Sequence, residues 1–106
     1  MAFANVTKRA TSGDGLVYTV PAGKQAEILS MMIANTASPA GDATFSLRWT
    51  HSNTSSTADF YHEIKLKTGE MLNAFAPGFL MNASDTLSVI VTEGQTDSVL
   101  SLNVTP

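Results

Sequence analysis

Two histidines, His51 and His62, are the side chains of this sequence best suited to acid–base or metal chemistry. Neither belongs to a His-x-x-x-His or His-Glu-x-x-His pair, and no Asp-rich calcium loop accompanies them. The chain has no cysteine, which excludes thiolate catalysis, cysteine-ligated zinc and disulfide bonds. We therefore expect no metal site, with His62 on a strand face and His51 in a hydrated loop.

Serine, histidine and aspartate are all present, but no motif arranges them for nucleophilic catalysis. The sequence has no Gly-x-Ser-x-Gly elbow, and it has no glycine-rich loop that could cradle a phosphate group. A triad of these residue types is therefore a matter of composition alone. We predict that the protein is not an enzyme and that it binds no cofactor.

Composition and charge narrow the remaining classes. The 106 residues form a single domain by length, and the formal net charge of -3 argues against a nucleic-acid-binding surface, which usually has a basic excess. The first 15 residues lack the apolar core of a signal peptide, and no apolar run approaches the roughly 20 residues of a membrane helix. We expect a protein that is made in the cytosol, is not exported by the usual route, and binds neither nucleic acid nor membrane.

The hydrophobic pattern has the period of two that is typical of β-strands. Residues Phe45, Leu47 and Trp49 alternate with polar residues, as expected for a half-buried strand. Similar alternation occurs at residues 86–93 and 98–105, and less regularly at 59–67. The chain also contains 13 threonines and 11 serines but only 14% charged residues, which favours strands over helices.

Turn signals separate these runs at short intervals. Glycine, proline and aspartate mark reversals at residues 12–15, 21–23, 38–42, 76–78 and 93–97. The polar segment at residues 51–59 reads as an exposed loop or a hairpin tip. About eight strands joined by such turns predict an all-β protein, an antiparallel β-sandwich of the jelly-roll or Ig-like kind. We divide the chain into an N-terminal arm, residues 1–15, and one sandwich domain, residues 16–106.

The run from residue 26 to residue 35 is apolar on both faces of the predicted strand. Strict alternation places Leu29, Met31 and Ile33 on one face and Ala26 and Ile28 on the other. One interpretation is a central strand that the protein covers on both sides. The other is that Leu29, Met31 and Ile33 form a patch that another subunit covers. Both hold if the covering segment comes from a neighbouring subunit.

The predicted N-terminal arm is a second candidate contact. It carries Lys8 and Arg9, two of the six positive charges of the chain, together with the apolar residues Phe3 and Val6. It reads either as a frayed end or as an arm that adds a strand to, or pairs charges with, a neighbouring subunit.

Aromatic residues offer an alternative binding function. Trp49, the sole tryptophan, together with Phe60 and Tyr61 could form a stacking platform for a sugar. Trp49, however, falls on the same face of its predicted strand as Phe45 and Leu47, which favours a place in the core.

Two segments resemble a pattern found in small β-sandwich virion structural proteins of tailed bacteriophages. The first is a Tyr-x-Val-Pro-Ala-Gly-Lys turn that leads into a strand with an Asn-Thr exit, and the second is an Asp-Thr-Leu-x-Val return to the sheet. The matching residues are Tyr18, Val20, Pro21, Ala22, Gly23, Lys24, Ile33 to Thr36, Asp85, Thr86, Leu87 and Val89. The resemblance runs from about residue 17 to the end of the chain.

This resemblance implies a structural module of a virion. From it we expect a non-enzymatic capsid decoration or cement protein that bridges major capsid subunits, synthesised in the host cytoplasm and located in the virion. Symmetric self-association would strengthen the contacts, with trimers at local threefold positions as one arrangement. The same resemblance allows a neck, head–tail connector, tail or fibre module. A carbohydrate-binding receptor domain at Trp49 is the alternative from another class.

Overall fold

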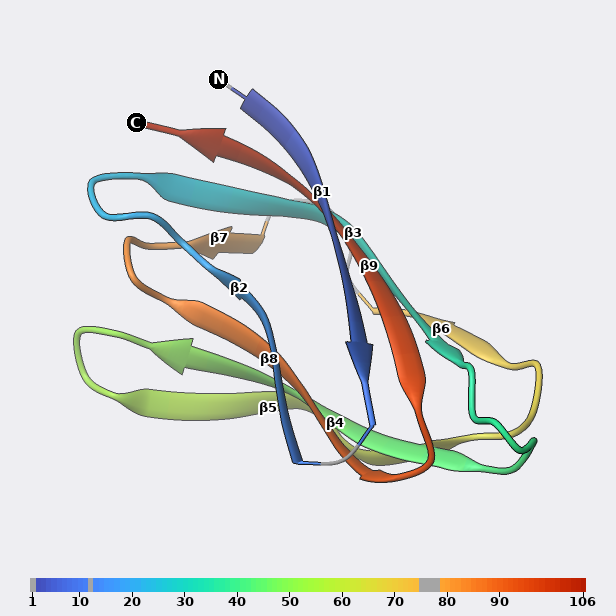
Figure 1. The fold of residues 1–106 in the computed structure, drawn as a ribbon. Helices are drawn as coiled ribbons and strands as arrows, with labels where there is room; N and C mark the ends of the chain where they lie inside the picture. The colour runs from blue at the N-terminus through green and yellow to red at the C-terminus, as the bar shows by residue number, and fades with distance from the viewer. Residues whose placement is uncertain (1, 12, 75–78) are drawn as a thin grey trace.

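A computed structural model describes residues 2–11, 13–74 and 79–106, and this part of the chain is all-β, with nine strands and no helix. The strands form two antiparallel sheets that pack face to face as a sandwich (Figure 1). Their bounds are β1 Ala2–Ala10, β2 Gly13–Thr19, β3 Gln25–Asn35, β4 Ala43–His51, β5 Ser56–Leu66, β6 Met71–Asn73, β7 Phe79–Met81, β8 Thr86–Glu93 and β9 Thr96–Thr105. The predicted fold class, an all-β antiparallel β-sandwich, is confirmed.

The strand order shows which kind of sandwich this is. One sheet, which we call sheet A, has the order β1-β9-β3-β6, with β7 also paired to β3. The other, sheet B, has the order β2-β8-β4-β5. Successive strands alternate between the two sheets, except that β4 and β5 both belong to sheet B and β6 and β7 both belong to sheet A. This is a jelly-roll arrangement (Figure 1). The sequence did not reveal β6 and β7, because three-residue strands are too short to show a period.

The core comes from the strands whose alternation is clearest in the sequence. Phe45 and Leu47 of β4 and Leu87 and Val89 of β8 are fully buried between the sheets. Trp49 is partly buried and packs against this core, at the end of the same face of β4. The interpretation of Trp49 as a core-packing residue therefore fits the structure.

A β-bulge in β3 corrects the predicted faces of that strand. The register with β9 shifts between Ile28 and Ser30, so Leu29 is an extra residue and every later side chain changes face. Met31 and Ile33 consequently lie on the same inner side as Ile28 and are buried in the core. The prediction that Met31 and Ile33 line a subunit contact is therefore wrong. Leu29, at the bulge, is half-buried.

The predicted N-terminal arm is a strand of the sandwich. Residues 2–10 pair with β9 without interruption, from Ala2 opposite Val104 to Ala10 opposite Thr96, and β2 begins at Gly13. The division between an arm at residues 1–15 and a domain at 16–106 is thus corrected, because this segment hydrogen-bonds to its own sheet. Both chain ends lie at the same end of the molecule (Figure 1).

The polar segment at residues 51–59 is mainly a hairpin. An exposed turn at residues 52–55 joins β4 to β5, and β5 already begins at Ser56. The predicted exposed tip is therefore shorter than expected. The turn predicted at residues 76–78 lies outside the described residues.

Candidate interaction surfaces

The densest cluster of polar side chains surrounds Asp85, in the turn before β8. Its carboxylate is fully buried and accepts hydrogen bonds from the backbone N–H groups of Asn82 and Ser52, both at 2.9 Å. The indole Nε1–H of Trp49 donates to the same carboxylate at 3.2 Å. Asp85 therefore caps its turn, as its position before the strand predicts, and also holds the β4–β5 hairpin.

Serine and histidine also lie beside Asp85, but their geometry is not that of a catalytic triad. The Ser52 hydroxyl donates to the carbonyl oxygen of Ala83 at 2.9 Å and to Asp85 Oδ1 at 3.2 Å. His51 Nδ1 lies 3.3 Å from the same Oδ1 and accepts a hydrogen bond from the N–H of Asn53 at 3.4 Å. Both side chains are thus turned toward the carboxylate, whereas a nucleophile needs a base bonded to its own hydroxyl. We interpret the cluster as a structural anchor.

The charge of Asp85 fits this structural role. Burial by itself raises the pKa of the Asp85 carboxyl, but hydrogen bonds from the backbone of Ser52 and Asn82 and from Trp49 outweigh it. The net effect is a lowered pKa, so the carboxylate stays ionised at neutral pH. Within residues 2–11, 13–74 and 79–106, no group of three or more His, Cys, Asp and Glu could hold a metal ion.

Acidic side chains gather on the outer face of sheet B, on β5, at the start of β4 and at the end of β8. We call this surface the acidic edge, and it comprises Asp42, Asp59, Glu63 and Glu93 with the cations Arg48 and Lys65. Near its end, Lys65 Nζ lies 3.9 Å from both Asp42 Oδ2 and Glu93 Oε1. One ammonium group is therefore shared by two carboxylates, and this part of the edge has excess negative charge.

The close approach of Asp42 and Glu93 depends on Gly94. Gly94 has φ +77°, in the left-handed region, and a Cβ there would overlap the carbonyl oxygen of Asp42 and lie 3.0 Å from Ala43 Cα. Only glycine allows the turn after β8 to lie this close to the start of β4. The local backbone therefore brings Asp42 and Glu93 within reach of the same Lys65.

The other part of the acidic edge is an ion-pair network. Arg48 donates to Asp59 with Nε at 2.7 Å and a terminal nitrogen at 3.3 Å. His62 Nδ1 lies 3.1 Å from Asp59 Oδ2, and His62 Nε2 lies 3.6 Å from Glu63. The hydrogen bond from Arg48 is the main cause of the lowered pKa of Asp59, with a smaller contribution from His62. His62 is on an exposed strand surface, as expected from its place in the sequence.

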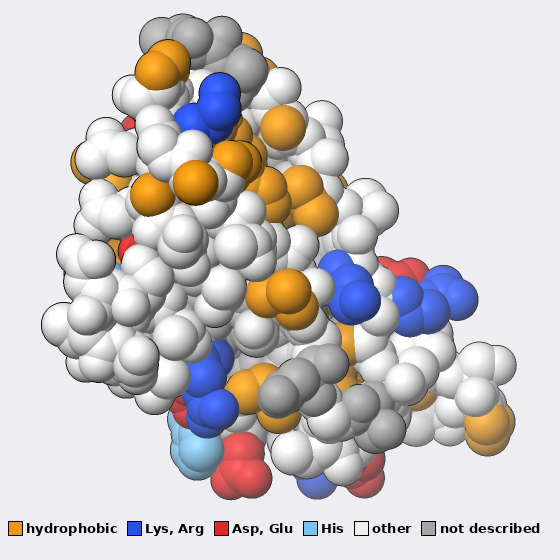
Figure 2. Space-filling view, turned by 60° about the vertical axis from the view of Figure 1, so that its left-hand side comes forward, with side chains coloured by type: hydrophobic (Ala, Val, Ile, Leu, Met, Phe, Trp, Pro, Cys, Tyr) orange, Lys and Arg blue, Asp and Glu red, His pale blue; other side chains and the backbone are white. Residues whose placement is uncertain are grey.

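The outer face of sheet A has the opposite character. We call it the neutral face. Its exposed apolar members are Phe3 of β1, Val99 of β9, Met32 of β3, Met71 of β6 and Leu80 of β7. Val99 lies directly opposite Met32, so these two form one row across neighbouring strands. Hydrophobic side chains gather in the upper half of the space-filling view, and most charged ones lie lower, toward its margins (Figure 2).

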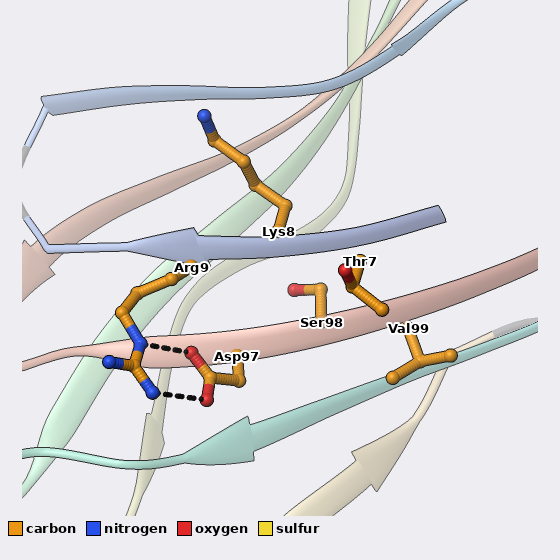
Figure 3. A pocket seen from close by; sticks show the side chains of 6 residues that line it. All are labelled: Thr7, Lys8, Arg9, Asp97, Ser98 and Val99. Carbon is orange, nitrogen blue, oxygen red and sulfur yellow. Dashed lines mark hydrogen bonds and ion pairs between the residues drawn. The ribbon is translucent and has the colours of Figure 1, made fainter. Parts of the chain in front are cut away.

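A shallow hollow of about 340 Å³ lies at one end of this sheet, along β1 and β9. Arg9 closes one side through two hydrogen bonds to Asp97, at 2.8 and 3.0 Å (Figure 3). Thr7 and Val99 lie farther along the same two strands (Figure 3). The pairing with Arg9 lowers the pKa of Asp97, so the charges at this border offset each other.

The structure brings together part of the predicted contact set. Phe3 lies on the neutral face, and Arg9 lies at the border of this face. The side chain of Lys8 extends from the other side of β1 (Figure 3). Val6 is partly buried and packs against the core, and Leu29 is half-buried in β3.

Sequence reasoning missed Met32, Met71, Leu80 and Val99. Strict alternation would place the polar Ser30 on the same face of the strand as the apolar Ala26 and Ile28. This mismatch was the available signal that the alternation shifts by one residue within β3.

The aromatic residues of the predicted sugar platform contact one another and the chain itself. The ring of Trp49 packs edge-on against Phe79, with 5.6 Å between centroids, and lies 5.2 Å from the ring of His51. Phe60 packs edge-on against the same Phe79 at 5.1 Å. The Tyr61 hydroxyl donates to the carbonyl oxygen of Ala74 at 3.2 Å. Phe79 of β7 thus packs against both Trp49 and Phe60, and the hydroxyl of Tyr61 is bonded to the backbone.

Comparison with known proteins adds one finding about the fold. No family model and no curated protein matches the chain. Among solved structures, the Drosophila NLP core, described in connection with pentamer formation and histone binding, is similar at a TM-score of 0.58. The sequence identity is 16%, and the match covers 100% of both chains. The likeness therefore extends over the whole sandwich and concerns its fold.

This finding corrects the predicted function. The structural neighbour that spans the whole chain is a histone-binding, pentamer-forming core and not a virion component, so the predicted role as a capsid decoration protein is wrong. The predicted partners, major capsid protein and other virion subunits, are wrong for the same reason, and the exclusion of nucleic acid has no support from this likeness.

Within the described residues, nothing helical has the length and hydropathy that a membrane crossing would require.

Proposed function

We propose that this protein is a non-enzymatic binding module that assembles into a closed ring of five copies and binds a basic protein of the histone class. The observation that carries the proposal is the likeness of its fold, over the full length of both chains, to a core described for pentamer formation and histone binding. Assembly and binding of basic partners come from that neighbour, and the surfaces of this chain are compatible with both.

The acidic edge supports a basic partner. It combines four carboxylates, Asp42, Asp59, Glu63 and Glu93, with the two cations Arg48 and Lys65, which form ion pairs with three of them. Each chain has a formal net charge of -3, so a ring of five carries -15. Repeated weak electrostatic contacts add up by avidity when one partner reaches several copies.

The assembly part is tested by the mass of the purified protein in solution. Light scattering after size-exclusion chromatography should give about five times the chain mass of 11.2 kDa, and native mass spectrometry should count the copies. A protein that stays monomeric at concentrations up to about 100 μM would contradict the assembly part of the proposal, since obligate interfaces persist well below this range.

The binding part is tested by titrating purified core histones into the ring and measuring affinity by fluorescence anisotropy near physiological ionic strength. Lysozyme, a small basic protein of unrelated shape, is one control, and a poly-lysine whose positive charge matches that of the histones is the second. We expect binding to histones that weakens as salt is raised, because exposed charges are screened beyond about 8 Å at 0.15 M salt.

The variant Glu93→Lys should weaken histone binding, since it inverts one charge of the acidic edge beside Lys65. The matched control is Glu70→Lys, the same change at an exposed residue of the turn between β5 and β6, which belongs to neither the acidic edge nor the outer face of sheet A. Equal affinity for histones and lysozyme would contradict a specific histone-class partner. Equal losses in the two variants would contradict the assignment of binding to the acidic edge.

A further inference from the structure

We infer that the neutral face of sheet A is where the next copy of this chain docks in the ring. The inference rests on the proposed function for the existence of the ring, and it adds which surface closes it. Of the seven large hydrophobic side chains that are exposed among the described residues, five lie on this face, and the other two are Leu16 and Phe60.

The charge distribution separates this face from the rest of the surface. Its outward side chains are apolar or uncharged, apart from Glu27 and the mutually paired Arg9 and Asp97. Subunit interfaces are depleted in charged residues at their centre and enriched in methionine and aromatic residues. Met32 and Val99, at 41% and 40% exposure, form such an uncharged centre, because each lies opposite the other on neighbouring strands.

Charge complementarity also decides between the two partners of the proposed function. A basic protein gains little from an uncharged surface, whereas the acidic edge on the opposite sheet attracts it. An apolar surface, in contrast, is stabilised by a partner that removes it from water. The neutral face is thus left for a second copy of the chain.

The neutral face is also large enough for a stable contact. The long strands β1, β9 and β3, about 30 Å each, and the short strands β6 and β7, about 10 Å each, give a projected area of roughly 500 Å² at a strand spacing of about 4.8 Å. Side-chain relief adds to this, so the accessible area approaches the roughly 800 Å² per partner of a stable interface. In a closed ring this face meets a different surface of the next copy, since cyclic rings of more than two subunits use head-to-tail contacts.

The first test is a charge insertion at the centre of the face. The double variant Met32→Lys/Val99→Lys should elute as a folded monomer of about 11 kDa, because two lysines would have to be buried in each contact. The matched control is Thr57→Lys, an exposed strand position on sheet B, which should assemble like the wild type. Circular dichroism of the separated species shows whether the double variant keeps its strands.

The second test does not disturb assembly. Because the chain has no cysteine, the single variants Val99→Cys and Thr57→Cys each carry one thiol that a maleimide can label. In the assembled ring, we expect labelling at Val99→Cys to be at least about tenfold slower than at Thr57→Cys. Diluting the ring to monomers should bring the two rates together.

The outcomes separate the inference from the proposed function. A wild-type ring that persists in the double variant, or equal labelling rates at the two cysteines within the ring, would overturn the inference and leave the ring itself intact. A wild-type protein that is monomeric at all concentrations would overturn the ring, and the inference with it. Loss of assembly in the double variant together with protected Val99→Cys would support the neutral face as the contact.

Discussion

Replacing Asp85 by alanine removes the acceptor for four donors at one end of the sandwich, of which only the Ser52 hydroxyl keeps a second acceptor, the carbonyl oxygen of Ala83. The backbone N–H groups of Asn82 and Ser52 and the indole N–H of Trp49 all donate to this fully buried carboxylate. A buried donor that loses its acceptor costs about 1–3 kcal/mol. Water can reach the partly exposed side of this cluster, so we take the low end and expect a loss of about 3–5 kcal/mol in the free energy of unfolding.

This loss is large compared with the total stability of a small domain, about 5–15 kcal/mol. At roughly 4 °C per kcal/mol for a domain of this size, the melting temperature should fall by about 12–20 °C. Urea unfolding followed by fluorescence gives the free energy directly, because Trp49 is the sole tryptophan and lies at the site. Circular dichroism checks that the transition reports the whole sandwich.

Two further variants make the measurement specific. Asp85→Asn keeps one acceptor oxygen and turns an amide N–H toward donors, so it should lose less than Asp85→Ala but more than about 1 kcal/mol. Asp59→Ala removes a carboxylate from the partly exposed ion pair with Arg48 and should cost about 1 kcal/mol or less. If Asp85→Ala costs no more than Asp59→Ala, then the buried hydrogen bonds do not anchor the hairpin and the reasoning is refuted.

Three other outcomes follow from the structure. The folded-state pKa of Asp85 is lowered, so the contribution of its carboxylate to stability is complete above the unfolded pKa of about 3.9 and is lost as the pH falls through the folded-state pKa. The difference in free energy of unfolding between wild type and Asp85→Asn, measured by urea unfolding, should therefore become smaller from pH 7 to pH 3. Gly94→Ala combines positive φ with overlap on Asp42 and should cost roughly 2–4 kcal/mol in the same assay, against about 1 kcal/mol for Gly69→Ala, whose Cβ meets nothing within 4 Å; equal costs would refute the steric argument. Phe45→Ala should lower the free energy of unfolding by about 3–5 kcal/mol, since the ring is fully buried, and a loss under about 1 kcal/mol would contradict its place in the core.

The fold class followed from local information. Alternating residues such as Phe45, Leu47 and Val89 identify strands because side chains in a strand point to opposite faces in turn, and the same residues prove to be fully buried. The turn before β8 was also readable, since an aspartate at that place hydrogen-bonds nearby backbone N–H groups, as Asp85 does with Asn82.

The candidate contact surface did not follow in the same way. Strict alternation assigned Met31 and Ile33 to an interface, and the bulge at Leu29 places both in the core and turns Met32 outward. One inserted residue reverses the faces of a strand from that point on, so a local error in phase becomes an error about function. The first strand was likewise assigned to an arm, because its pairing partner β9 lies at the other end of the sequence.

The sequence by itself determined the strand-forming segments, most of the core and the turn chemistry, because each of these depends on residues that are near one another in the chain. Only the tertiary structure decided the order of the strands, the bulge, and which uncharged side chains share an outer face. Met32 and Val99 are 67 positions apart in the sequence and become neighbours through the pairing of β3 with β9. A surface built from such pairs depends on long-range register, which alternation within a single strand does not encode.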